Sequence, residues 1–151
     1  MNLPITNWQL IADPNFINKL LSIDWQAIFI KLLKSDNGSQ LSASQAVSAI
    51  YRYGLFLYLI SKYPHKKMVP NEEIDAVLHA HIANTQQFEQ DCRHLFNAKL
   101  IHVSEVGIKV EERQEWLLTF THTQSLFQRN YGRNAMGSSI PACCELLLSF
   151  T

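Results

Sequence analysis

The chain has 151 residues, the usual size of one domain, and 47% of them are hydrophobic, so it can bury a core without disulfides or metals. The 13 basic and 13 acidic residues balance, which argues against binding to nucleic acid or to an anionic membrane. Three cysteines, two of them adjacent, do not suit a disulfide framework and indicate reduced thiols. We therefore expect one cytoplasmic domain, residues 1–151, whose protein partners the composition leaves open.

The N-terminal part of the chain begins without the basic and apolar regions of a signal peptide and continues with two short helical patterns. Asp13-Pro14 is a typical helix start, an N-cap followed by proline, and Asp24 precedes the second pattern. The turn residues Asp36-Asn37-Gly38-Ser39 predict a break after it. The apolar residues that define the two helices are Phe16, Ile17, Leu20, Leu21, Trp25, Ile28, Phe29, Leu32 and Leu33.

A long helix is predicted from Ser42 to about residue 63, because Ser42 and Gln45 form a capping-box pattern and Pro64 ends the run. From Ile50 onward the helix is apolar on nearly every side, which is typical of the central helix of a domain. The apolar stretch is shorter than the roughly 20 residues that cross a bilayer. We therefore expect a core helix whose tyrosines are packing residues.

Two adjacent helices are predicted at about residues 71–82 and 85–98, and a longer one at about residues 111–130. Pro70 lies at the start of the first, and Asn84-Thr85 is a typical cap for the second. In all three segments the apolar residues recur with a helical period.

The remaining segments are a polar connection and an apolar tail. Val103–Val110, which contains Gly107, can hold a short extended piece. The tail, Ile140–Phe150, is expected to dock as a short helix or to stay loose, and it carries Cys143 and Cys144. Together the elements predict an all-α fold, a single-domain irregular helical bundle of about six helices, with residues 136–151 as a flexible tail.

Four of the six histidines lie between Pro70 and His102. At about 100° per residue, His81 falls in the middle of the apolar stripe of its helix and should be buried. Asp75 and His79 lie four residues apart on one flank of that stripe, where they can hydrogen-bond to each other. A buried imidazole needs partners, because an unpaired buried polar group costs about 1–3 kcal/mol.

The next helix places further polar residues near the same core. Cys92 lies near the centre of its apolar stripe and Asp91 at the edge, whereas His94 points away and is excluded from any buried site. If the two helices form an antiparallel hairpin, His81 and Cys92 face a shared core. His102 follows the hairpin and could fold back onto it.

Three interpretations of these residues stay open. The simplest is a structural network in which Cys92 is a core residue, His81 bonds a backbone carbonyl and Asp75 pairs with the histidine four residues on. A second is a site for zinc or another transition metal, although the spacing matches no standard zinc motif. Its ligands would be His79, His81, Cys92 and His102, supported by Asp75 and Asp91. In a third, Cys92 is a nucleophile with His81 or His102 as its base, although a buried cysteine is usually inert.

The stretch Val69–Thr85, followed by Phe88 and Asp91-Cys92, resembles the core signature of the glycine-rich domain-containing protein family of plant and small bacterial proteins. The residues on its pattern positions are Pro70, Asp75, His79, His81, Phe88, Asp91, Cys92 and His102. The resemblance covers about residues 40–135. This chain departs from the family in having Leu78 for a tryptophan, Phe96-Asn97 for phenylalanine-glycine, and no glycine-rich tail.

The resemblance implies that the Asp/His/Cys cluster forms one spatial unit, and plant members of the family are linked to stress and hormone responses. By this analogy we expect a helical interaction or regulatory domain with a buried cluster that holds a transition metal. The alternative is a metal-dependent enzyme that uses the same cluster.

Overall fold

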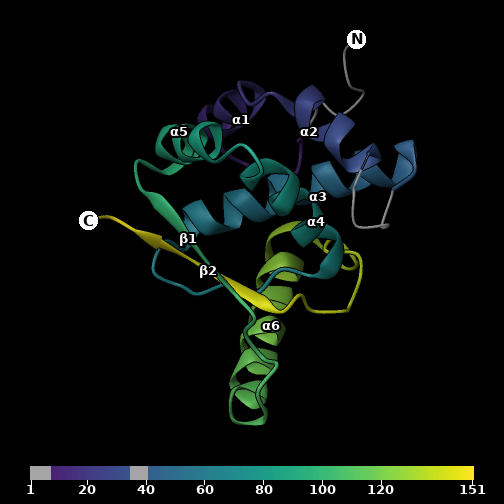
Figure 1. The fold of residues 1–151 in the computed structure, drawn as a ribbon. Coiled ribbons are helices and arrows are strands. Elements are labelled where there is room, and N and C mark those ends of the chain that lie inside the picture. Colours follow the sequence, from purple (N-terminus) through teal and green to yellow (C-terminus); the bar gives the residue numbers. More distant parts are fainter. Residues whose placement is uncertain (1–7, 35–40) are drawn as a thin grey trace.

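The structure, a computed structural model, describes residues 8–34 and 41–151. Within these ranges the chain forms six helices and two strands (Figure 1). The bounds are α1 Pro14–Leu21, α2 Trp25–Leu33, α3 Ala43–Lys62, α4 Glu72–Ile82, α5 Thr85–Phe96, β1 Lys99–Ser104, α6 Val110–Tyr131 and β2 Cys144–Ser149. The predicted break at residues 36–39 lies outside the described residues.

The caps read from the sequence are confirmed at three helix starts. The Asp13 side chain accepts hydrogen bonds from the first backbone N–H groups of α1. Ser42 and Gln45 bond each other's backbone reciprocally at the start of α3, and the Asn84 side chain accepts from the Gln87 N–H in α5. Helix α4 begins just after Pro70, and Asn71 is its cap, because the Asn71 side chain accepts from the N–H of the third helical residue.

Helix α3 lies in the middle of the core, as its all-round apolar sequence predicts. Helices α2, α4 and α6 contact it, and Figure 1 shows it crossing the molecule between them. Trp8 lies against its middle and donates its indole N–H to the Tyr51 carbonyl at 2.9 Å. Gly54 permits this approach, since a Cβ there would collide with the Trp8 ring. No helix in the described ranges is long and apolar enough to cross a membrane.

The expectation of an all-α bundle of about six helices is confirmed in part: the described residues form six helices, but β1 and β2 add a small antiparallel sheet, so the fold is not strictly all-α. The predicted short helix or loose tail is strand β2. Its alternate residues Cys144, Leu146 and Leu148 are buried while Leu147 is exposed, which is the period of a strand with one face on the core. The extended piece expected at 103–110 begins earlier, at Lys99, and α6 starts at its far end.

Candidate functional site

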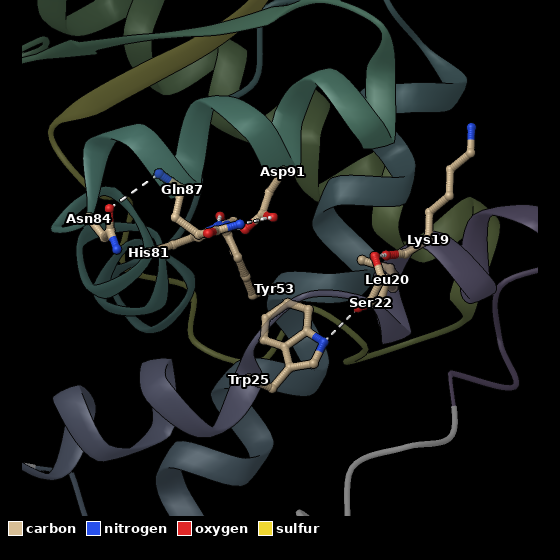
Figure 2. A network of polar contacts seen from close by, with 9 residues as sticks. All are labelled: Lys19, Leu20, Ser22, Trp25, Tyr53, His81, Asn84, Gln87 and Asp91. Atoms are coloured by element: carbon tan, nitrogen blue, oxygen red, sulfur yellow. Dashed lines mark hydrogen bonds and ion pairs between the residues drawn. The ribbon is translucent and has the colours of Figure 1, made fainter.

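Tyr53 of α3, His81 of α4 and Asp91 of α5 form a buried hydrogen-bonded network (Figure 2). His81 is only 4% exposed. Its Nδ1 lies 2.7 Å from the Tyr53 hydroxyl, and its Nε2 lies 2.8 Å from Asp91 Oδ2. Gln87, one turn earlier on α5, donates to the other Asp91 oxygen at 2.9 Å. Three helices are thus joined through one imidazole ring.

The chemistry of this network assigns its protons. A carboxylate only accepts, so the His81 Nε2–H donates to Asp91, which leaves Nδ1 to accept the Tyr53 O–H. Burial raises the pKa of Tyr53 well above its usual value, and the nearby Cys92 and Asp91 raise it further, so the phenol keeps its proton. With both nitrogens engaged, His81 has no free lone pair for a metal or for a thiol proton.

A second cluster lies between α4 and the sheet. Asp75 of α4, His102 of β1 and Cys144 of β2 each offer a ligand atom within 4.8 Å of the others. The Cys144 thiol donates to Asp75 Oδ1 at 3.3 Å. The register of the sheet explains the meeting, because His102 pairs with Leu146, two residues from Cys144, and residues two apart share one face of a strand.

His102 is the unsatisfied member of this group. Its Nε2 is one of two buried side-chain polar atoms without a hydrogen-bond partner in residues 8–34 and 41–151. Burial lowers the pKa of His102 below its usual value of 6.5, although Asp75 opposes the shift, and neighbouring His79 lowers it further. The ring is therefore neutral at pH 7, so one of its nitrogens keeps a lone pair that can bind a metal.

His79 flanks the same group at the protein surface. Its Nε2 lies 3.3 Å from Asp75 Oδ2, and its ring stands edge-on to His102 with the centroids 5.5 Å apart. The hydrogen bond to Asp75 raises the pKa of His79 above 6.5. The side chain is 60% exposed, so solvent reaches this side of the cluster. His79 can orient Asp75 or supply a further nitrogen ligand.

The four predicted metal ligands do not lie together. His79 and His102 are neighbours, whereas His81 belongs to the buried network and bonds two side chains in place of the expected carbonyl. The reason is helix phase, since His81 faces the core and Asp75 and His79 lie on the flank. Asp75, predicted only to support the ligands, places its own carboxylate in the group. His94 is exposed, as predicted.

Cys92 stands apart from the metal-ligating group found in the described residues. It is buried in the core, and burial, together with the nearby Asp91 and Glu89, raises its pKa to about 12. A thiol with this pKa carries little thiolate at neutral pH, and His81 has no nitrogen free to take its proton. These observations argue against Cys92 as a nucleophile and favour its role as a core residue.

Sequence reasoning missed two members of the clusters. Cys144 was placed in a mobile tail, because the consecutive leucines that follow it hide the alternation typical of a strand. Tyr53 was treated as one of several packing tyrosines, and it lies 28 residues from His81 on a different helix. The one signal in the local sequence was the predicted burial of His81. Burial implies that the ring has a hydrogen-bond partner, but it does not indicate which residue that partner is.

No family model, curated protein or solved structure matches this chain. The resemblance to the glycine-rich domain-containing protein family therefore stays a prediction.

Proposed function

We propose that the protein is a helical interaction or regulatory module that binds a transition metal, zinc being the best fit, through Asp75, His102 and Cys144. The main support is the buried, unpartnered nitrogen of His102 in a group that also holds a carboxylate and a thiol. One nitrogen, one sulfur and one oxygen donor suit zinc and its neighbours better than magnesium or calcium. We also propose that the chain is related to the glycine-rich domain-containing protein family and that it works in the cytoplasm.

The residues have distinct tasks in this proposal. Burial raises the pKa of the Cys144 thiol, and Asp75 raises it further, so the metal must displace a proton on binding. Asp75 already holds that thiol and contacts His79, which fixes the direction of its carboxylate. The metal would link α4 to both strands, and binding it would therefore hold the sheet against the helices.

A metal-dependent enzyme is the second candidate, favoured by two observations. The group has three members, as in catalytic zinc sites that keep a fourth position for water or substrate. The largely exposed His79 also gives solvent a route to it. Cobalt-substituted protein separates the two, because azide changes the cobalt spectrum only when a coordination position is open. No spectral change would support the closed module.

The first test is elemental analysis of protein purified without chelator. We expect close to one equivalent of a transition metal, and less than about a tenth of an equivalent would reject the proposal, since structural zinc binds tightly. The decisive comparison uses two adjacent thiols, buried Cys144 and exposed Cys143. Cys144→Ser should abolish the thiolate-to-cobalt charge-transfer band, and Cys143→Ser should leave it unchanged. Equal charge-transfer bands in both variants would show that the sulfur ligand is neither Cys144 nor Cys143.

A further inference from the structure

The short segment before α4 lies beside the chain that carries Cys144, and the two are fastened together at both ends. At one end Met68 and Leu146 exchange two backbone hydrogen bonds, at 2.8 and 2.9 Å. At the other end the Pro70 carbonyl accepts from the Ala142 N–H at 2.9 Å. A regular antiparallel ladder continued from the first pair would bring Cys144 opposite Pro70 in place of Ala142. Relative to this segment, the chain therefore bulges between Ala142 and Leu146, where both adjacent cysteines lie.

Regular pairing also ends at the cysteines on the β1 side. Val106, which lies beyond the end of β1, donates its N–H to the Cys143 carbonyl at 3.0 Å, one residue out of register with the ladder. The Cys144 thiol nevertheless reaches Asp75 Oδ1 at 3.3 Å. Because a bulged segment can bow in more than one way, this contact requires that the chain leading into the bulge be fixed against α4.

Asn71 provides that attachment. It is completely buried, and its Nδ2 donates to the carbonyls of Met136 and Ser138, at 2.9 and 2.8 Å. Its Oδ1 accepts from the Ile74 N–H at 2.9 Å and so caps α4, whose first turn carries Asp75. One amide group therefore joins the start of the helix that holds the carboxylate to the connection that leads into β2.

The cap alone does not require an asparagine at this position. Serine, threonine and aspartate also cap helices, because each offers a side-chain oxygen to the same backbone N–H groups. Only an amide adds two N–H donors to that oxygen, and Asn71 uses both of them. Aspartate would keep the cap but would set a carboxylate against two carbonyl oxygens. The residue type therefore points to a second task, which is to hold the connection between α6 and β2.

We propose that Asn71 is a positioning residue for the metal cluster. By fixing the connection before β2 against α4, it places the Cys144 thiol against Asp75 and thereby sets the metal affinity of the site. The effect on affinity rests on the proposed metal-binding function, whereas the placement of the thiol holds with or without a metal. Outer hydrogen bonds that orient metal ligands usually contribute about 10–100-fold to affinity.

Cobalt titration of the full chain, followed through the thiolate-to-cobalt charge-transfer band, tests the effect on affinity. Asn71→Asp should weaken cobalt binding about tenfold or more. Asn84→Asp is the matched control, because Asn84 caps α5 in the same way, and it should leave the affinity unchanged. Tyr53→Phe controls for a general loss of stability, since it removes a hydrogen bond from the other cluster, and it should also bind cobalt as wild type does. Equal affinities for Asn71→Asp and wild type would overturn the effect on the metal site.

Alkylation of the metal-free protein, read by mass spectrometry in a Cys143→Ser background, tests the placement of the thiol. Asn71→Asp should let Cys144 react about tenfold faster, because the chain that holds the thiol can then open locally. Asn84→Asp should leave its rate unchanged. Buried Cys92 should stay unlabelled in every variant, which shows that the core is intact.

A milder variant keeps the test decisive if Asn71→Asp unfolds the protein and exposes Cys92. Asn71→Ser retains a capping oxygen, adds no charge and is too short to reach both carbonyls, so the same increase in Cys144 labelling is expected. Unchanged labelling of Cys144 in a folded Asn71 variant would overturn the inference. A wild-type chain that binds no cobalt would reject the proposed metal binding, and the labelling rates would still decide whether Asn71 positions the thiol.

Discussion

Helix α4 borders two polar clusters, each with a histidine at its centre, and the two clusters differ in how fully their polar atoms are paired. His81 is enclosed by Tyr53 and Asp91, and both of its ring nitrogens have partners. His102, reached from the flank of the same helix, leaves a buried nitrogen without one. A satisfied network stabilises the fold and resists new ligands, whereas an unsatisfied donor set can gain from a ligand that completes it. The comparison separates a structural cluster from a binding cluster.

The largest expected difference is between the reactivity of buried Cys92 and that of exposed Cys143 toward an alkylating reagent. With a pKa of about 12 in place of the usual 9.0, Cys92 has about a thousandfold less thiolate near pH 8. Raising the pH toward 12 should restore the thiolate form of Cys92, and with it the reactivity of this residue. Mass spectrometry after brief alkylation of the folded protein should show label on Cys143 and none on Cys92. Equal labelling of both would return Cys92 to consideration as a nucleophile.

Removing the imidazole from the satisfied cluster should destabilise the protein strongly. His81→Ala leaves a cavity and removes the partner of the Tyr53 hydroxyl and of Asp91 Oδ2, so we expect a loss of about 3–4 kcal/mol in the free energy of unfolding. His94→Ala, on the exposed side of α5, is the control and should change it by under about 0.5 kcal/mol. Urea unfolding measures both. Similar midpoints for the two variants would show that the network contributes little.

Zinc should stabilise the protein through the unsatisfied cluster alone. Free zinc at about a hundred times its Kd should raise the free energy of unfolding by about 2.7 kcal/mol. Cys144→Ala should remove this increment, and Tyr53→Phe, in the other cluster, should retain it. Thermal melting with and without chelator provides the measurement. If Tyr53→Phe lost the increment too, the clusters would be coupled rather than separate.

The smallest expected effect comes from a single oxygen in the satisfied cluster. Tyr53→Phe leaves His81 Nδ1 without its donor and should lower the free energy of unfolding by about 1–2 kcal/mol. Tyr51→Phe, two residues earlier on α3, is the matched control and should cost under about 0.5 kcal/mol. Chemical denaturation resolves this difference. Equal losses of stability in the two variants would contradict a hydrogen bond donated by Tyr53 to His81.

The local features of the fold were predictable from the sequence. The caps at Asp13, Ser42 and Asn84 involve residues two or three apart, and the burial of His81 follows from the phase of one helix. Such features depend on neighbours along the chain, which a periodic pattern describes. For the same reason the contact of Asp75 with His79, four residues on, was foreseeable.

The sheet and the metal-ligating group were not predictable in this way. Cys144 meets Asp75 across 69 residues of sequence, and no spacing rule describes such a contact. Strand β2 could be recognised only through alternation, which the exposed Leu147 masks by being apolar. Tyr53 resembles its aromatic neighbours on α3 in every local respect. Tertiary packing alone decides which of them meets His81.

The pairing of β1 with β2 has a consequence for how the molecule assembles. The whole of α6 separates the two strands, so β1 is synthesised well before its partner exists. Until then both of its edges are open, with apolar side chains on the outward face, and an unpaired strand of this kind is prone to adhere to other nascent chains. Rapid docking of the later strand would therefore protect yield during biosynthesis as well as completing the donor set.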